Sequence, residues 1–324
     1  MLRALITGVG GFAGSHLADV LLAHPGSEVW GCVIDDGRPD YLDPRVQLIQ
    51  ADLRDPQAAS GLLHRVRPDR VYHLAGQSFP QLSWADPWDT FETNLRPQIN
   101  LFESMLRLEL RPRVLVVGST EAYGQMASDE APVPETAELR PCNPYAVSKA
   151  AQDLIGLQYF LSHDLPVVRV RPSNHIGPRQ NERFVAPSFA RQIARIEAGR
   201  QPPVLRVGNL SARRDFTDVR DVARAYWLAL EHGELGEAYN VGAGRAIPVQ
   251  QILDGLLALT TADVHVEVDP GLLRPTDTPI RSGDPAKLRA HTGWQAEIPL
   301  EQTLRDLLDY ERSRVGERLP TGSV

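Results

Sequence analysis

The sequence predicts an α/β protein in which a doubly wound parallel β-sheet is followed by a smaller C-terminal α/β part. Two observations support this fold class. Short β-branched runs alternate with longer helical patterns through the first half of the chain, and a glycine-rich turn joins the first strand to the first helix. A chain of 324 residues, of which 42% are hydrophobic and 23% charged, is long and apolar enough to bury a sizeable core.

The elements of the first half follow one another in regular alternation. Asn143 as N-cap and Pro144 at the first helical position give the last helix of this half a clear start. Strands are predicted at 3–7, 28–34, 46–50, 70–75, 113–119 and 166–172, and helices at about 12–23, 56–66, 87–108 and 144–163. This order is typical of βαβ units and therefore of a parallel sheet.

The second half has a different texture, rich in Pro, Arg and Asn from Arg171 onward. Helices are predicted near 184–199 and 218–233, in "PVQQILDGLLALT" and in "LEQTLRDLLDYERS", and strands at 237–242 and in "VHVEV". We therefore expect a first domain at 1–171, to which 219–252 return. A second domain is expected from 172–218 together with 253–324.

Charge and cysteine content narrow the classes of partner. A net charge of −7 argues against a nucleic-acid partner, which favours a basic protein face. Cys32 and Cys142 are the only cysteines, so we expect no disulfide framework and no metal site, and a cytoplasmic location fits. We find no secretory signal and no apolar segment of membrane-spanning length, so no membrane association is expected.

The turn after the first strand, "ITGVGGFAGSHL", carries Gly8, Gly11 and Gly14 in G-x-x-G-x-x-G spacing. Glycine is needed there because the backbone turns tightly and approaches a pyrophosphate closely, while the following helix N-terminus supplies unpaired N–H groups. The turn predicts a dinucleotide-binding Rossmann domain with NAD(P)H as cofactor. Phe12 and Ala13 of the same turn are also expected to contact this cofactor.

Acidic residues after the second and third strands bear on the adenosine end of the cofactor. Asp35 and Asp36 would accept hydrogen bonds from a ribose 2′-hydroxyl and repel a 2′-phosphate, which favours NADH. Arg38 opposes that preference, so the choice between NADH and NADPH stays open. Asp52 and Leu53 are expected at the sheet edge where adenine would rest, with a turn or cap role as the alternative for Asp52.

Tyr145 and Lys149 are four residues apart on one face of a predicted helix. An unperturbed phenol has a pKa near ~10, and an ammonium group one turn away favours the phenolate and brings that pKa toward neutrality. Ser119 or Thr120, in "GSTEAYG", ends a neighbouring strand and would hydrogen-bond the same substrate oxygen. Glu121 follows directly, as a catalytic base, a ligand for substrate hydroxyls or a loop residue.

The glycine turn, "HLAGQS" (73–78), "GSTEAYG" (118–124) and "YAVSK" (145–149) together resemble the extended short-chain dehydrogenase/reductases that act on nucleotide sugars. In the second half, "RPSNHIGPRQNERFVAPSFARQIARIEAG", "RVGNLSARRDFTDVRDVARAYWLAL" and "LRPTDTPIRSGDPAKLRAHTGW" resemble the GDP-mannose branch of that family. The resemblance extends over nearly the whole chain.

The resemblance implies a role for each matching residue. Ser119, Tyr145 and Lys149 match the family's catalytic triad, and Ser119 fits its hydroxyl position better than Thr120. Further implied contacts are Leu74, Ala75 and Gly76 with the cofactor, and Asn174, Val185, Asn209, Arg214 and Arg274 with a GDP-sugar held by the second domain. The alternatives are a salt bridge from Arg214 to Asp215 or Asp218, and a solvated loop position for Arg274. His73 and His175 are interpreted as structural.

Two reactions are compatible with the family. The second-half motifs favour reduction of the C4 ketone of GDP-4-keto-6-deoxy-D-mannose by NAD(P)H to GDP-D-rhamnose, the C4 epimer being an alternative product. The second reaction is 4,6-dehydration of GDP-mannose, with Glu121 as the C5 base. An interpretation of another class is a non-catalytic NAD(P)-sensing protein. The resemblance also implies a homodimer formed through the helices near 87–108 and 144–163.

Overall fold

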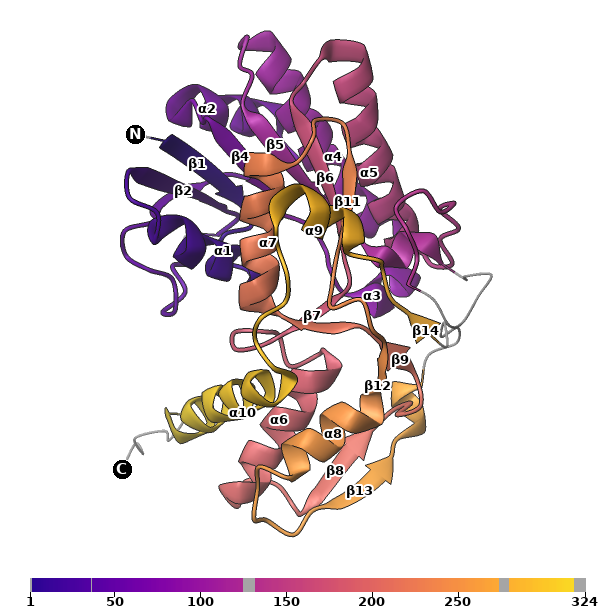
Figure 1. Cartoon of the computed structure of the whole chain (residues 1–324). Helices are drawn as coiled ribbons and strands as arrows, with labels where there is room; N and C mark the ends of the chain where they lie inside the picture. Colours follow the sequence, from indigo (N-terminus) through magenta and orange to yellow (C-terminus); the bar gives the residue numbers. More distant parts are fainter. Residues whose placement is uncertain (1, 36, 125–131, 274–279, 318–324) are drawn as a thin grey trace, which may run out of the picture.

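The computed structural model describes residues 2–35, 37–124, 132–273 and 280–317 and is centred on a seven-stranded sheet (Figure 1). The strands are β1 (Leu2–Thr7), β2 (Ser27–Val33), β3 (Gln47–Gln50), β4 (Arg70–His73), β5 (Arg113–Val117), β6 (Val167–Pro172) and β11 (Ala238–Val241). Their order is β11-β6-β5-β4-β1-β2-β3, and every neighbouring pair is parallel. The predicted α/β class with a doubly wound parallel sheet is confirmed.

The strand order places a crevice for ligands between β1 and β4. The chain runs outward from β1 through β2 to β3, then returns to β4 on the other side of β1. At such a reversal the loops that follow the two strands diverge, and ligands of α/β sheets bind at the carboxyl ends of those strands. Here these loops are the glycine turn after Thr7 and the segment after His73.

Helices cover both faces of the sheet. One layer contains α2 (Pro56–Val66), α4 (Pro87–Arg107) and α5 (Pro144–His163), and the other contains α1 (Phe12–Leu22), α7 (Val219–His232) and α9 (Ala286–Thr292). Separate apolar cores fill the space under each layer. The predicted start of α5 is confirmed, because the Asn143 Oδ1 atom accepts a hydrogen bond from the Ala146 amide at 2.7 Å and Pro144 follows the cap.

A further apolar core lies below the sheet in Figure 1. Its helices are α6 (Val185–Glu197), α8 (Val249–Leu257) and α10 (Leu300–Glu317), packed with the parallel pair β8 (Val204–Val207) and β13 (His265–Val268). Short strands connect it to the first part, namely β7 (Asn174–Ile176) with β10 (Phe216–Asp218), and β9 (Arg213–Arg214) with β12 (Ile247–Pro248) and β14 (Ile280–Arg281). The remaining short helices are α3 (Pro80–Ala85), η1 (Thr120–Tyr123) and η2 (Pro270–Leu272).

The packing follows the predicted return of the chain to the first sheet, with two local differences. α7 and β11 join the sheet and its α1 layer, as expected. α8 instead buries Ile252 in the lower core, and Leu288 and Trp294 pack into the α1 layer, where the Trp294 indole N–H donates to the Asp221 carbonyl at 2.9 Å. The division of the chain into two domains stays a prediction. None of the described helices is long and apolar enough to cross a membrane.

Candidate active site

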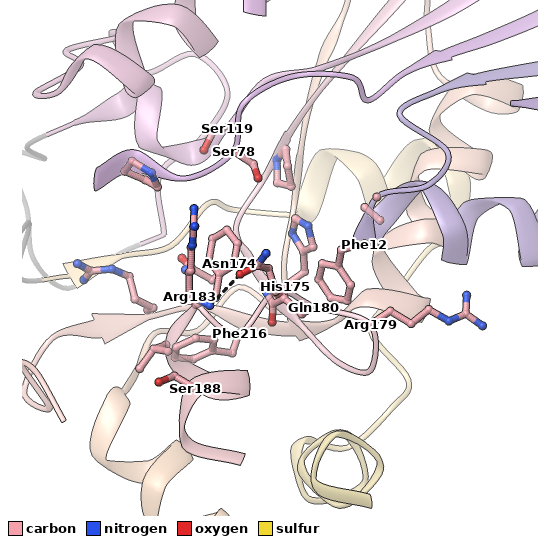
Figure 2. Close-up of a pocket in the computed structure, with 18 of the residues that line it drawn as sticks. Phe12, Ser78, Ser119, Asn174, His175, Arg179, Gln180, Arg183, Ser188 and Phe216 are labelled. Atoms are coloured by element: carbon pink, nitrogen blue, oxygen red, sulfur yellow. Dashed lines mark hydrogen bonds between the residues drawn. The ribbon is translucent and has the colours of Figure 1, made fainter. Parts of the chain in front are cut away.

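A cavity of about 1150 Å³ lies between the carboxyl ends of the central strands and the lower core. Its wall includes the glycine turn, the ends of β4 and β5, the first turns of α5, the segment after β6, and side chains of α6 and α10. Figure 2 shows Ser78 and Ser119 at one side of the cavity, Ser188 and Phe216 at the other, and Asn174 and Arg183 between them. Both halves of the chain therefore contribute to one site.

The glycine turn forms the end of the cavity beside α1. Gly8 has a φ of +72°, and a Cβ atom on Gly14 would lie 2.3 Å from the Gly8 carbonyl oxygen, so both positions require glycine. α1 has no side-chain cap at Gly11 and no acidic residue in its first turn. Its first N–H groups are thus open to an anion, an arrangement that fits the pyrophosphate of NAD(P)H. All five residues predicted in this turn line the cavity: Gly8, Gly11, Phe12, Ala13 and Gly14.

The two hydroxyls after β5 have different surroundings. The Thr120 hydroxyl is buried and donates to the Pro172 carbonyl at 3.3 Å, which uses its hydrogen within the fold. The Ser119 Oγ atom accepts from the Glu121 amide at 3.1 Å, so its hydrogen can still be donated to a ligand. Both residues line the cavity, and this difference supports Ser119 as the hydroxyl of the triad.

Tyr145 and Lys149 lie on one face of α5, and both line the cavity. The Lys149 Nζ atom is 6.0 Å from the centre of the Tyr145 ring and donates to the Val117 carbonyl at 3.1 Å and to Gln152 Oε1 at 2.9 Å. Burial lowers the pKa of Lys149 to about 8, and the group remains mainly protonated at pH 7. A positive charge is therefore held beside the phenol, as the predicted acid–base pair requires.

Glu121 lines the cavity and also contacts the start of α5. Its Oε2 atom accepts a hydrogen bond from the Asn143 side-chain amide at 3.1 Å, and Asn143 is the N-cap of the helix that carries Tyr145. Glu121 is thus a residue of the cavity wall whose carboxylate also supports the position of the catalytic helix. Glu121 can therefore act chemically as a base toward a ligand or serve as a structural support of α5.

The predicted substrate-binding residues from the second half reach the same cavity. Asn174, Val185, Asn209 and Arg214 all line it. Asp218 pairs with Arg220 at 2.7 Å, and the Asp215 carboxylate accepts from the Gly244 amide and the Ser282 hydroxyl. The two acids considered as salt-bridge partners of Arg214 therefore have other donors.

The cavity wall is rich in arginine. Among the residues that the structure describes, five guanidinium-bearing side chains line it: Arg179, Arg183, Arg206, Arg214 and Arg314. Arg179 pairs with Asp19 at 2.8 Å and lies over the Tyr41 ring at 5.5 Å, so part of this charge also holds the two halves together. Guanidinium groups bind phosphate oxygens through two parallel hydrogen bonds, and a wall of this kind suits a diphosphate.

Comparison with known proteins identifies the family. A sequence model of the family described as GDP-mannose 4,6 dehydratase matches residues 5–307. The chain belongs to this family. A relative from Pseudomonas aeruginosa, named GDP-6-deoxy-D-mannose reductase, is 36% identical over 315 residues, which cover 97% of this chain and 99% of that protein. A GDP-mannose 4,6-dehydratase from Vibrio cholerae is 30% identical, with 98% of this chain and 95% of that protein covered.

Solved structures of similar proteins have the same fold. The structure of RMD from Pseudomonas aeruginosa complexed with NADPH has a TM-score of 0.85 at 34% identity and covers 97% of this chain and 100% of that chain. UDP-glucose 4-epimerase from Thermus thermophilus in complex with NAD has a TM-score of 0.85 at 31% identity, with 96% of this chain and 99% of that chain covered. These comparisons confirm the predicted membership of the extended short-chain dehydrogenase/reductases.

Leu74, Ala75 and Gly76 line the cavity of this GDP-mannose family member, but three other residues predicted to bind the cofactor, Asp35, Asp52 and Leu53, do not. Asp35 is exposed outside it, and Leu53 is buried in the core under α2. Asp52 forms a salt bridge with Arg54 at 2.7 Å, which is the local turn role considered as its alternative. Their cofactor contacts stay predictions. Asp36 and Arg274 lie outside the described residues.

The two histidines have different positions. His73 is buried at the end of β4, its Nδ1 atom paired with the Thr7 hydroxyl at 2.8 Å, and burial lowers its pKa to about 3. It stays neutral and acts structurally, in line with the sequence-based interpretation. His175 lines the cavity and stacks on Phe12 at 5.5 Å. It therefore joins the cofactor turn to the second half instead of shaping only its own loop.

Sequence reasoning missed several residues of the site. Tyr41, Arg183, Arg206, Tyr226 and Tyr310 line the cavity, yet none was selected from the sequence. Each lies outside the glycine turn and the triad motif, on a loop, helix or strand that tertiary packing brings to the site. The arginine-rich composition of the second half was the signal available for the guanidinium groups.

Proposed function

We propose that this chain reduces the C4 ketone of GDP-4-keto-6-deoxy-D-mannose with NAD(P)H and forms GDP-D-rhamnose, also called GDP-6-deoxy-D-mannose. One observation carries the proposal. A single cavity brings Ser119, Tyr145 and Lys149 of the first half together with Asn174 and Arg214 of the second. The full-length similarity to a protein named GDP-6-deoxy-D-mannose reductase supports the choice of substrate.

The residues of the triad account for proton transfer and charge stabilisation. NAD(P)H, when bound, supplies the hydride that adds to C4. Tyr145 gives its phenolic proton to the C4 oxygen as the carbonyl becomes an alcohol, and Ser119 donates a hydrogen bond to the same oxygen. Lys149 stabilises the phenolate that remains on Tyr145 and binds ribose hydroxyls of the cofactor. Solvent then returns the proton to Tyr145.

The second half holds the nucleotide part of the substrate. Arg214 and its neighbouring arginines bind the diphosphate, Asn174 lies along the sugar, and Val185 and Asn209 lie near the guanine. Support comes from their common cavity, from the burial of Arg214 and from the Asn209 side chain, whose Oδ1 atom accepts from the Ser211 amide at 3.0 Å and is thereby fixed. Arg274 completes this proposed set.

A second candidate is 4,6-dehydration of GDP-mannose, because Glu121 lines the cavity two residues after Ser119. A dehydratase requires a carboxylate base for the C5 proton, and Glu121 is a carboxylate in the site. The hydrogen bond from Asn143 gives Glu121 a structural role in the reductase as well. We therefore keep reduction as the proposed reaction.

We further propose that the protein is a cytoplasmic homodimer. Each copy would have a cofactor-binding domain and a nucleotide-sugar-binding domain. Val147, Leu154 and Leu161 recur every seven residues on α5 and are exposed, as are Trp88 and Ile99 on α4. α4 packs on α5 within the chain, so these apolar side chains form a stripe along a helix pair. A second copy would cover this stripe and form a four-helix interface.

The test supplies GDP-4-keto-6-deoxymannose with NADH or NADPH, and GDP-mannose alone in parallel. The proposal expects nicotinamide oxidation with the keto sugar and no turnover of GDP-mannose. Binding of NAD(P)H without turnover of either sugar would indicate a sensing protein instead.

A further inference from the structure

Tyr226 is a buried phenol in the wall of the cavity. It lies in the middle of α7, is 1% exposed, and packs in the core under the α1 layer. It also lines the cavity, and its hydroxyl has no hydrogen-bond partner among the described residues. A buried hydroxyl without a partner costs free energy, and most buried polar atoms in proteins are paired. Such an atom beside a ligand cavity points to a partner that arrives with the ligand.

The position of Tyr226 is at the reacting end of the cavity. Val117 and Pro172, at the ends of β5 and β6, line the same cavity, and α7 packs against both of these strands. The Lys149 Nζ atom donates to the Val117 carbonyl at 3.1 Å, so the strand end against which α7 packs also holds the predicted acid–base pair. Burial raises the pKa of Tyr226, so the group is a neutral phenol that can donate and accept a hydrogen bond.

The polar groups of a dinucleotide at this end are few. Lys149 and Tyr145 are committed to the ribose hydroxyls and the substrate oxygen, which leaves the carboxamide of the nicotinamide ring. A carboxamide offers both a donor and an acceptor and matches a neutral phenol. We propose that Tyr226 is a cofactor-positioning residue whose hydroxyl hydrogen-bonds this carboxamide and so fixes the rotation of the nicotinamide ring. The proposal rests on the use of NAD(P)H in the proposed function.

Tyr72 provides a matched control within the same core. It lies on β4, is fully buried, and its hydroxyl likewise has no partner among the described residues. Unlike Tyr226, it does not line the cavity. The substitutions Tyr226→Phe and Tyr72→Phe therefore remove the same atom from the same kind of surroundings, and only one of them faces the cofactor.

The experiment measures binding of NADPH and NADH by nicotinamide fluorescence, and of ADP-ribose and its 2′-phosphate by competition. ADP-ribose lacks the nicotinamide ring, so it reports on the rest of the cofactor site. We expect Tyr226→Phe to raise the Kd of the preferred NAD(P)H about 3- to 10-fold, which is the loss of one hydrogen bond, and to leave the ADP-ribose Kd unchanged. Tyr72→Phe should leave both unchanged, and the melting temperature of each variant without ligand should equal or exceed that of the wild type.

The outcomes separate this inference from the proposed function. If the wild type binds NAD(P)H and Tyr226→Phe binds it equally well, the inference is overturned and the function stands. If the variant loses affinity for ADP-ribose to the same degree as for NAD(P)H, the hydroxyl acts on the fold and not on the carboxamide. If the wild type binds neither nicotinamide nucleotide, the proposed function fails and this inference fails with it.

Discussion

The Asn143 side chain connects Glu121 to the helix that carries Tyr145. Its Nδ2 atom donates to Glu121 Oε2 at 3.1 Å, while its Oδ1 atom accepts the Ala146 amide at 2.7 Å. The amide thus uses both ends, one to cap α5 and one to bind the carboxylate. The position of Glu121 suits the base of a dehydratase. Its hydrogen bond with Asn143 also helps to hold the helix that carries Tyr145, which a reductase needs as well.

Glu121→Gln should keep most of the reductase activity, because a glutamine Oε1 atom still accepts the bond from Asn143. Glu121→Ala removes the acceptor and should lower the free energy of unfolding by about 1 kcal/mol. Initial rates with the keto sugar and urea denaturation measure the two effects. A loss of about 10²-fold or more in kcat for Glu121→Gln with the keto sugar would contradict a purely structural role of Glu121 in the reduction.

Ser119→Ala should reduce kcat by about 10²-fold, as expected when one donor to a developing oxyanion is removed. Thr120→Val breaks only the bond to the Pro172 carbonyl and should reduce stability more than rate. Steady-state kinetics and thermal melting of both variants check this. Equal rate losses in the two variants would contradict the assignment of the triad hydroxyl to Ser119.

Affinity for NAD(P)H should decline as the pH rises through about 8, where burial places the pKa of Lys149. Above that pH the ammonium loses its charge and becomes a poorer donor to the ribose. The pKa of Lys149 in the folded chain lies below its ordinary value of 10.5, so the unfolded chain binds more protons between about pH 8 and pH 10.5, and Lys149 adds stability as the pH rises. Unfolding of the protein through the titration of Lys149 therefore does not explain the loss of affinity for NAD(P)H.

The control for that titration is a nucleotide without the nicotinamide ribose. The affinity for ADP, or for 2′,5′-ADP if NADPH is preferred, should stay constant between pH 7 and pH 9, since these ligands lack the nicotinamide ribose that Lys149 is proposed to bind. A parallel decline for both ligands would assign the titration to another group.

Asp153→Ala should destabilise the protein by about 3–5 kcal/mol, because it leaves buried guanidinium groups without their counter-ion. Asp153 is fully buried and accepts from Arg171 Nε at 2.8 Å and from Arg169, while Arg171 Nη1 donates to the Tyr123 hydroxyl at 2.9 Å. Asp52→Ala breaks the more exposed pair with Arg54 and should cost about 1 kcal/mol or less. Similar losses in urea denaturation would contradict the buried network.

Leu154→Arg should produce a monomer if the apolar stripe on α4 and α5 is the dimer interface. Leu235 is also exposed but lies between α7 and β11, so Leu235→Arg is the control. Light scattering at micromolar concentration measures both variants and the wild type. A monomeric wild type, or a dimer that survives Leu154→Arg, would contradict the proposed interface.

Sequence patterns predicted the elements whose geometry is set locally. The spacing of Gly8, Gly11 and Gly14 reflects one strand-to-helix turn, and Tyr145 and Lys149 reflect one helix turn, so both groups line the cavity as expected. Strand ends were less predictable. β5 ends at Val117 because Ser119 caps η1, and β4 ends at His73 because the Ala75 amide donates to the Thr7 hydroxyl.

Positions set by tertiary packing were not predictable from single segments. Tyr226 occurs in an ordinary amphipathic pattern, and only the packing of α7 on β5 and β6 brings it to the cavity. Such contacts depend on segments far apart in the chain, which periodicity and motif spacing do not encode.

The most direct test of the proposed reaction follows deuterium. The keto sugar is incubated with NADPH or NADH carrying deuterium at the transferable position of the nicotinamide, and the product is analysed by NMR. We predict deuterium at C4 of a GDP-6-deoxyhexose. Conversion of C4-deuterated GDP-mannose to a keto sugar that carries the label at C6, without added reduced cofactor, would contradict the proposed reduction.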